Sequence, residues 1–375
     1  MTTGRVLVLN AGSATLKATV LDLPSTRPLF EEETDWPAAA SEREIDAAVR
    51  RMVASLASHG IPNASLAAVG HRVVHGGERF TGPASIDDET LDVLERHADL
   101  APLHNPRGIT TIRAARQRFD DIPHVAAFDT AFHSTLSDVA RRYPVPDEWV
   151  ERYGVRRYGF HGLSVEWSVR RAAELLEHDD NGLRLIVAHL GGGCSVTAVD
   201  GGRSVHTSMG MTPLEGLMMG TRAGSIDPGI IFRLMRSGVP AEEIEHALEH
   251  ESGLLGVGDT ADMRRLLQKE RDGDRGAAMA IDMFVDRAAA GIAAAATALD
   301  AVDAVVFTGG IGEHAAAVRL RICARLSILG LPEPSHDELG TEGVEARSSS
   351  GIAVCVVHAR EDVVIAEAAL GIARR

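Results

Sequence analysis

Two short turns in this chain carry side chains and glycines that are suited to binding phosphate. Each turn follows a short apolar, β-branched run and leads into a strand of alternating pattern. The polar members of the first turn are Asn10, Ser13, Thr15 and Lys17. The second turn comprises His189, Leu190, Gly191, Gly192 and Gly193. Glycine lets several backbone N–H groups point at one anion, and a lysine ammonium suits phosphate.

One such turn lies in each half of the chain, which predicts a phosphate chain held from both sides. The first turn leads into a strand and not into a helix, so it is not a Walker A motif. An ordinary hairpin, in which Asn10 only tolerates the turn conformation, is the alternative.

Two arginines are candidates for binding an anionic substrate. Arg72 ends an apolar strand beside a glycine pair, and Arg222 lies in the glycine-rich, charge-poor segment 207–228. The planar guanidinium group suits carboxylate and phosphate, and a solvated ion pair fits the surroundings of Arg222 poorly. A structural ion pair is the alternative for each.

Three histidines have positions from which they could act on a phosphoryl group. His189 ends a strand before the triple glycine, and His161 precedes Gly162. A ring N–H at such a place can donate to a phosphoryl oxygen. His104 lies in a proline-bearing loop, where a plain loop role is the alternative.

Carboxylates follow two of the expected strands. Asp129 closes the apolar run 125–128, and Glu361 follows the last strand. Magnesium prefers one or two carboxylates together with water and phosphate oxygens, so these residues are candidate ligands. A turn acid or helix N-cap is the alternative for Asp129. The histidines and cysteines show no zinc spacing.

A later glycine turn, at 309–312, follows the apolar strand 304–308. It lacks the third glycine of a dinucleotide fingerprint at the right spacing. A strand, a glycine turn and a helix in this order nevertheless suit contact with the sugar or base of a nucleotide.

The elements that must position these residues alternate between strands and helices. Hairpins are expected at 1–22 and at 185–200, and helices at 45–59, 90–100, 107–118, 242–249, 277–299 and 363–373. This β–α–β pattern predicts an α/β fold with a mixed or parallel sheet and active groups at the strand ends. The pattern changes at 130–135, where we place the domain boundary.

Composition limits the possible partners. The chain has 375 residues, which favours two domains, and a net charge of −15. We therefore expect no nucleic acid or membrane partner. Three cysteines without metal spacing indicate reduced thiols and a cytoplasmic location. The first residues run directly into a strand, so no signal peptide is expected, and the alanine-rich stretch 288–298 is too short to span a bilayer.

These pieces, in this order and over nearly the whole chain, resemble the acetate kinase (acetokinase) family. The segments that carry the resemblance are 10–17, 70–77, 103–106, 128–133, 158–162, 189–191, 211–216, 219–222, 307–313 and 361–366. The family belongs to the actin-like superfamily of phosphotransferases, so the resemblance implies a two-domain, duplicated, ribonuclease-H-like fold with an interdomain cleft. It implies an N-terminal domain of residues 1–133 plus 363–375 on the acyl side, and a C-terminal domain of residues 134–362 on the nucleotide side.

The resemblance also implies a role for each matched residue. The catalytic set is Asp129, His161 and Arg222, with His161 and Arg222 on the transferring phosphoryl group. The substrate set is Arg72 for the carboxylate and Val74, Leu103, Phe160 and Pro213 for the acyl methyl. The metal set is Asn10 and Glu361, and Ser13, Thr15 and His104 lie on the phosphate side. The nucleotide set is Lys17, His189, Leu190, Gly191, Gly192, Gly193, Asp262, Met263, Arg264, Gly310, Ile311, Gly312, Glu313 and His314.

The implied reaction is direct in-line transfer of the γ-phosphoryl group of ATP to acetate, with Mg²⁺ (or Mn²⁺) and no phosphoenzyme. Acetate is already ionised at neutral pH, so Asp129 is better interpreted as an orienting group than as a base. The pair Gly310-Ile311 keeps the small profile that an adenosine pocket needs, which favours ATP over pyrophosphate. The family suggests a homodimer.

Several residues depart from the usual family pattern. A usual asparagine is replaced at three positions, by Gly192, His314 and Arg360. Val165 replaces a usual histidine, Ser225 replaces a usual aspartate, and Ala14 replaces a usual serine. The departures leave donor preference and rate open. The alternatives to acetate kinase activity are a propionate or butyrate kinase, an actin-like ATPase switch or polymerising subunit, and an inactive nucleotide-binding regulator.

Overall fold

The computed structural model divides the chain into two compact units. It describes residues 3–12, 15–36, 41–96, 98, 101, 105–179, 182–332, 334 and 341–374. Unit 1 comprises Met1–Ser134 and Arg360–Arg375, and unit 2 comprises Thr135–Ala359. Relative to the domain bounds expected from the sequence, Ser134 and residues 360–362 belong to unit 1. One reason is that Arg360 donates to the carbonyl of Thr26, which fixes this residue to unit 1.

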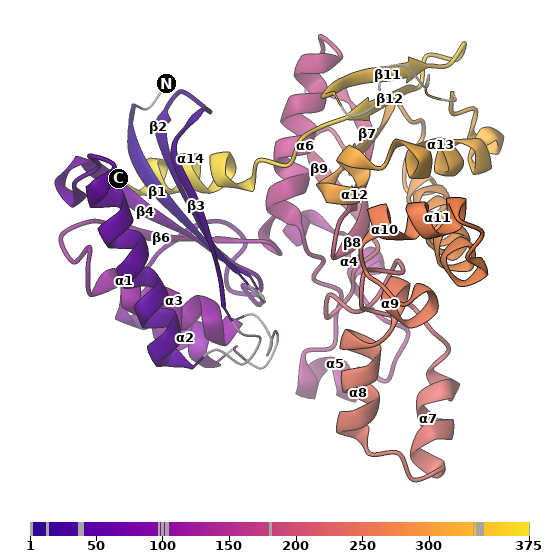
Figure 1. Cartoon of the computed structure of the whole chain (residues 1–375), viewed down its shortest axis with the longest axis horizontal. Coiled ribbons are helices and arrows are strands. Elements are labelled where there is room, and N and C mark those ends of the chain that lie inside the picture. Colours follow the sequence, from indigo (N-terminus) through magenta and orange to yellow (C-terminus); the bar gives the residue numbers. More distant parts are fainter. Residues whose placement is uncertain are drawn as a thin grey trace. The chain divides into compact units, whose positions relative to one another are not determined.

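Unit 1 is built on a six-stranded mixed sheet of order β3-β2-β1-β4-β6-β5 (Figure 1). Its strands are β1 (Gly4–Ala11), β2 (Thr15–Leu23), β3 (Pro28–Asp35), β4 (Leu66–Val73), β5 (Ala84–Ser85) and β6 (His124–Phe128). The first three strands are antiparallel, whereas β4 and β6 continue the sheet in parallel with β1. Since parallel strands end at the same edge, β1, β4 and β6 bring their carboxyl ends together.

Helices bury the apolar faces of this sheet. They are α1 (Glu42–Ser58), α2 (Asp88–Arg96), α3 (Asn105–Arg116) and α14 (Glu361–Ala373), with the 3₁₀ turns η1 (Asn63–Ser65) and η3 (Ala131–Thr135). The last helix, α14, lies along β1, β4 and β6, as Figure 1 shows. A Cβ atom at Gly70 would lie 2.6 Å from Cγ2 of Ile365, so this glycine permits the close approach of β4 and α14.

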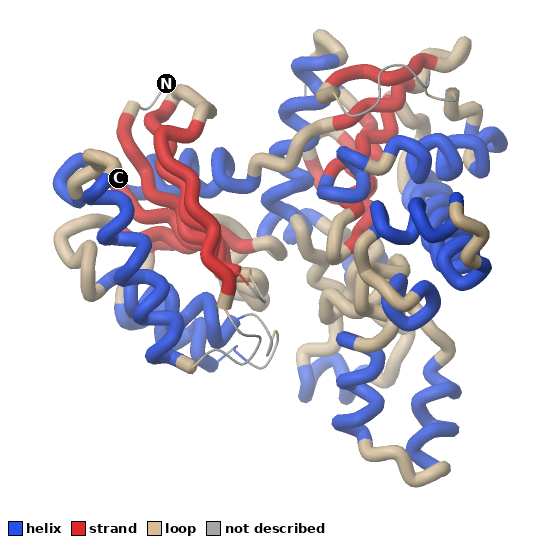
Figure 2. Tube along the Cα trace, in the orientation of Figure 1, coloured by secondary structure: helices blue, strands red, loops and turns tan. Residues whose placement is uncertain are grey.

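Unit 2 repeats the same sheet. Its strands are β7 (Arg184–Leu190), β8 (Cys194–Asp200), β9 (Arg203–Thr207), β10 (Ala304–Thr308), β11 (Gly343–Arg347) and β12 (Ala353–Val356). Their order, β9-β8-β7-β10-β12-β11, follows the same sequence of antiparallel and parallel pairs as unit 1. Figure 2 shows the strands of each unit gathered in one twisted sheet. The predicted duplicated, two-domain α/β fold is therefore confirmed.

The helices of unit 2 are more numerous and cover the sheet and the insertions between its strands. They are α4 (Asp138–Arg141), α5 (Asp147–Tyr153), α6 (Gly162–Leu175), α7 (Pro228–Arg236), α8 (Ala241–His250), α9 (Gly253–Gly258), α10 (Met263–Arg271), α11 (Arg275–Ala296), α12 (Gly309–His314) and α13 (Ala316–Arg325), with the turn η5 (Ser327–Leu329). Among the described residues, no helix is both long and apolar enough to cross a bilayer.

Candidate active site

In unit 1, Arg72 is the centre of a cluster at the carboxyl ends of β1, β4 and β6. Its Nε and one terminal nitrogen donate to the two carboxylate oxygens of Asp129, at 3.0 and 2.5 Å. The other terminal nitrogen donates to Oδ1 of Asn10 at 3.2 Å. The carboxylate of Glu361, at the start of α14, lies 3.6 Å from Nε. Parallel pairing of β1 with β4 and of β4 with β6 brings these side chains together, although they are far apart in sequence.

The electrostatics of this cluster keep Arg72 charged. Burial disfavours the charged guanidinium, but the carboxylates of Asp129 and Glu361 outweigh burial and raise the pKa of Arg72. The side chain of Asp129 is 1% exposed and that of Arg72 is 18% exposed. In the described part of the chain these contacts take three of the five guanidinium N–H donors, so a carboxylate ligand still has donors to bind.

The other predicted residues of unit 1 are more scattered. Lys17 lies on β2 and forms a half-exposed ion pair with Glu31 on β3, at 2.5 Å. Thr15 begins β2, and its carbonyl accepts from Gly12 N–H at 2.8 Å. Val74 is buried directly after β4. The predicted residues Ser13, Leu103 and His104 lie outside the described residues.

In unit 2, the two predicted histidines are stacked. The rings of His161 and His189 have centroids 4.1 Å apart with an interplanar angle of 25°. His189 comes from β7, and His161 is the residue before α6. His161 adopts a left-handed backbone conformation, with φ of 60°, which is uncommon for a residue other than glycine.

Gly193 brings the turn backbone against both candidate phosphoryl-binding groups. A Cβ atom at Gly193 would lie 3.2 Å from Nε2 of His161 and 3.6 Å from a terminal nitrogen of Arg222. The same nitrogen of Arg222 donates to the carbonyl of Pro213 at 3.1 Å. Burial lowers the pKa of Arg222, an effect that the carboxylate of Glu249 opposes. His161, Arg222 and the backbone at Gly193 therefore lie together in unit 2, in an arrangement whose N–H groups suit an anion.

The glycine-rich segment 309–312, which follows β10, lies against the turn at residues 189–193. Gly309 has φ of 77°, and a Cβ atom there would lie 2.9 Å from the carbonyl oxygen of Leu190, so only glycine fits. At Gly310 a Cβ atom would meet no described atom within 4 Å, which leaves its backbone accessible to a ligand. Ile311 and Gly312 lie within α12, and the His314 side chain is exposed.

Some residues predicted to line the nucleotide site have other contacts. Glu313 is buried, and its Oε1 accepts from the backbone N–H groups of Gly309 and Ala359, each at 3.0 Å. Asp262 caps α10 and forms an ion pair with the exposed Arg264 at 3.2 Å. Met263, like Phe160, is buried.

Sequence reasoning missed three supporting groups. Ser195 bonds to His161 and Ser164 bonds to His189, through fully buried hydroxyls. The fully buried Arg319 pairs with Glu345 and donates to the carbonyls of Gly312 and Glu313, at 2.8 and 2.9 Å. The only sequence signal for the serines is that each neighbours a predicted motif, and Arg319–Glu345 gives no signal at all.

The residues of unit 1 fit a hard divalent cation. Asn10, Asp129 and Glu361 supply one amide and two carboxylate groups around Arg72, and Mg²⁺ prefers such oxygen ligands. Within the described ranges, no group of three or more His, Cys, Asp or Glu residues could hold a metal ion alone.

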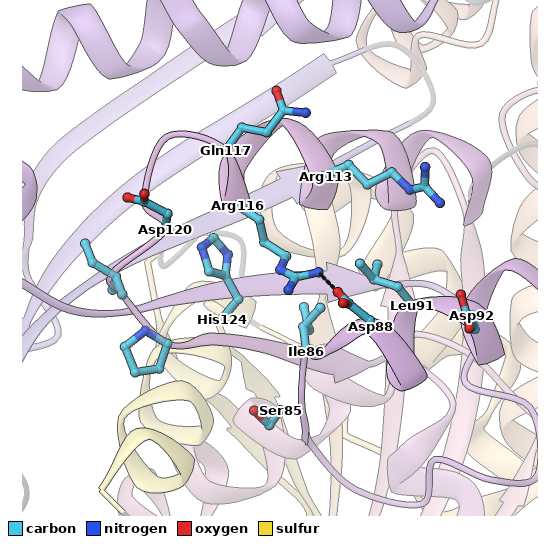
Figure 3. Close-up of a pocket in the computed structure, with 12 residues that line it drawn as sticks. Ser85, Ile86, Asp88, Leu91, Asp92, Arg113, Arg116, Gln117, Asp120 and His124 are labelled. Atoms are coloured by element: carbon cyan, nitrogen blue, oxygen red, sulfur yellow. Dashed lines mark hydrogen bonds and ion pairs between the residues drawn. The ribbon is translucent and has the colours of Figure 1, made fainter.

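A separate cavity of about 620 Å³ lies in unit 1 (Figure 3). None of the predicted site residues lines it; its lining residues are Ser85, Ile86, Asp88, Leu91, Asp92, Arg113, Arg116, Gln117, Asp120, Ile122, Pro123 and His124. Its two arginines are already paired, Arg116 with Asp88 at 3.0 Å and Arg113 with Glu95. We therefore place the chemistry at the strand ends and not in this cavity.

Two sheets of equivalent strand order, each with candidate site residues at the carboxyl ends of its strands, define a duplicated, two-domain α/β protein. Residues 5–367 match the Acetokinase family, and the chain belongs to that family.

Named relatives agree with this assignment. The chain is 46% identical to an acetate kinase of Deinococcus radiodurans, with 96% of each chain covered. The structure resembles a propionate kinase of Francisella tularensis (TM-score 0.90, 34% identity, 98% of this chain and 99% of the other). It also resembles an acetate kinase of Porphyromonas gingivalis (TM-score 0.88, 32% identity, 98% and 99% covered).

Replacing Gly193 with alanine is expected to lower kcat by about tenfold, because the new methyl group would displace the ring of His161 by a few tenths of an ångström. The measurement is steady-state phosphoryl transfer. Gly371→Ala in α14 is the control, since nothing lies within 4 Å of a Cβ atom there. Equal rates for Gly193→Ala and wild type would show that His161 need not hold this position.

Proposed function

We propose that this protein is an ATP-dependent kinase that phosphorylates the carboxylate of acetate, giving acetyl phosphate and ADP. The observation that carries the proposal is the convergence of His161 Nε2 and Arg222 on the Gly193 backbone in unit 2. A histidine, an arginine and backbone amides at one point suit a phosphoryl group whose charge spreads over its equatorial oxygens. Family membership and relatives named acetate kinase support the same reaction.

The acyl acceptor would bind in unit 1, where Arg72 retains N–H donors for a carboxylate. Acetate is ionised at neutral pH and needs no base. Asp129, which holds Arg72 through both oxygens, would orient the acceptor-binding group and not remove a proton. The carboxylate could then attack the γ-phosphorus directly, without a phosphoenzyme.

The nucleotide would bind to unit 2. Gly192 and Gly310 offer backbone groups that side chains do not cover, and Gly191 lies between Leu190 and Gly192 in the same turn. Arg222 and His161 would stabilise the transferring group. Asn10 and Glu361 would hold Mg²⁺ (or Mn²⁺), which when bound neutralises charge on the phosphate oxygens. Lys17 and Thr15, together with Ser13 and His104, would contribute on the phosphate side.

A propionate kinase is a second candidate, because one of the close structural relatives carries that name. The two activities differ by one methylene in the acyl pocket, which is worth about 1–3 kcal/mol in selectivity. The residues that the family resemblance assigns to the acyl methyl are Val74, Leu103, Phe160 and Pro213.

We further propose that the protein acts in the cytoplasm as a homodimer. Four apolar side chains of α7 in unit 2, Ile230, Phe232, Leu234 and Met235, are exposed together with none of the helix buried. Large apolar side chains exposed together on one helix are typical of an interface. The cysteines of the chain, Cys194, Cys323 and Cys355, are free, as is usual for proteins of a reducing compartment.

Hydroxylamine trapping of acyl phosphate, with ATP and Mg²⁺ and with acetate, propionate or butyrate in turn, tests the acceptor. We expect kcat/KM to be highest for acetate and to fall by about 10-fold or more with each added methylene. A preference for propionate would make the protein a propionate kinase. No trapped product with any acid would remove the kinase proposal and favour an ATPase switch or an inactive regulator.

A further inference from the structure

Two buried serine hydroxyls hold the two histidines of unit 2. Oγ of Ser195, on β8, lies 2.9 Å from Nδ1 of His161. Oγ of Ser164, in the first turn of α6, lies 2.8 Å from Nδ1 of His189. Both serines are fully buried, so neither hydroxyl is a surface contact that water could replace.

The position of the His161 ring is set by its neighbours and not by its own backbone preference. His161 has φ of 60° and ψ of 20°, a conformation that costs free energy for any residue other than glycine. Its ring is stacked on His189 at 4.1 Å, and its Nδ1 is bonded to Ser195. The stacking on His189 and the hydrogen bond with Ser195 together hold the ring in one orientation.

This orientation decides which nitrogen meets the phosphoryl group. With Nδ1 directed at Ser195, Nε2 is the atom that lies next to the Gly193 backbone, close to Arg222. A serine hydroxyl that donates to Nδ1 also selects the neutral tautomer in which Nε2 carries the proton. That tautomer presents an N–H donor to a phosphoryl oxygen.

We propose that Ser195 and Ser164 are positioning residues of the transfer reaction. Ser195 fixes the ring and tautomer of His161, and Ser164 fixes His189 as the surface on which that ring stacks. The proposal rests on the proposed function for its kinetic consequences, but the ring orientation and tautomer can be measured without any turnover.

The kinetic test compares Ser195→Ala with two other variants. We expect Ser195→Ala to lower kcat by about 10–100-fold, the usual effect of losing the orienting partner of a histidine, with KM for ATP and acetate changed less than about threefold. Ser195→Thr, which keeps the hydroxyl, should restore most of kcat. The matched control is Thr197→Val. Thr197 lies two residues further along β8, is fully buried, and its hydroxyl bonds to that of Thr207 at 3.1 Å.

The second readout is the ¹⁵N spectrum of histidine-labelled protein. In wild type, His161 should show the tautomer with the proton on Nε2, and in Ser195→Ala its two nitrogen shifts should move toward the average of exchanging tautomers. Ser164→Ala should move the shifts of His189 in the same way.

Unchanged kcat and unchanged His161 shifts in Ser195→Ala would overturn the proposal. An equal loss of kcat in Thr197→Val would also overturn it, because the effect would then be one of strand packing. If wild type makes no acyl phosphate, the proposed function fails, whereas the ¹⁵N spectra still decide whether Ser195 sets the His161 tautomer.

Discussion

Arg222→Ala is expected to lower kcat by about three to five powers of ten, the range for losing an arginine that stabilises a transferring phosphoryl group. Arg222 lies beside the Gly193 turn and His161, with its guanidinium partly withdrawn from water. A cation in such surroundings interacts more strongly with developing negative charge than it would in bulk solvent. The measurement is single-turnover phosphoryl transfer, so that product release does not mask the chemical step.

A suitable control is Arg184→Ala. Arg184 begins β7, at the opposite end of that strand from His189, and pairs with Asp303 at 2.9 Å in a partly exposed position. Its loss should leave kcat within about twofold of wild type. Near-normal turnover in Arg222→Ala would show that this arginine takes no part in phosphoryl transfer and has only a structural role.

The second large effect is expected for Arg72→Ala, because removal of Arg72 leaves the buried carboxylate of Asp129 without its ion-pair partner. Arg72→Ala should therefore lower the free energy of unfolding of unit 1 by about 3–5 kcal/mol and raise KM for acetate. Urea unfolding would be followed by fluorescence of the buried Trp36, in a chain with Trp149 and Trp167 replaced by phenylalanine.

Arg5→Ala provides the matched comparison in the same sheet. Arg5 pairs with Asp22 at 3.3 Å, and both side chains are about two-fifths exposed. Solvent screens such a pair, so its loss should cost less than about 1 kcal/mol. Equal destabilisation by Arg72→Ala and Arg5→Ala would contradict the account of the buried pair.

The sequence predicted most of the sheet but not all of it. The apolar β-branched runs that became β1, β7, β10 and β12 are buried on both faces, so composition alone identifies them. The edge strand β3 was missed because only Phe30 of its eight residues is buried and three glutamates follow Phe30 within the strand. Charges of this kind protect an edge from pairing with other chains, and they hide the strand from pattern recognition.

The candidate site residues were predicted from their types and motifs, whereas the contacts between them depend on how the strands pair. Neither the bidentate contact of Arg72 with Asp129 nor the contact with Asn10 follows from spacing, since 57 and 62 residues separate the partners. Glu313 shows the limit most clearly. It follows the glycine turn and suggested a ligand contact, but its carboxylate binds backbone N–H groups of its own unit. Motif position cannot reveal the direction in which a side chain points.

The supporting residues could not be predicted for a related reason. Ser164 and Ser195 are ordinary residues for the first turn of a helix and for a strand, and only the pairing of β7 with β8 places Ser195 opposite His189. Arg319 lies on α13 and Glu345 on β11, 26 residues further along the chain, and their pairing depends on burial of both side chains. Such contacts arise from packing and leave no periodic signal.

The most direct test of the account is the stoichiometry of the reaction with purified protein, ATP, Mg²⁺ and acetate. ADP release should depend on acetate, and each ADP should be matched by one acetyl phosphate trapped as the hydroxamate. We expect this one-to-one ratio, and we expect ADP formation to fall to background when acetate is left out. ADP release that continues at the same rate without acetate, or without any trapped acyl phosphate, would contradict the assignment of a carboxylate kinase.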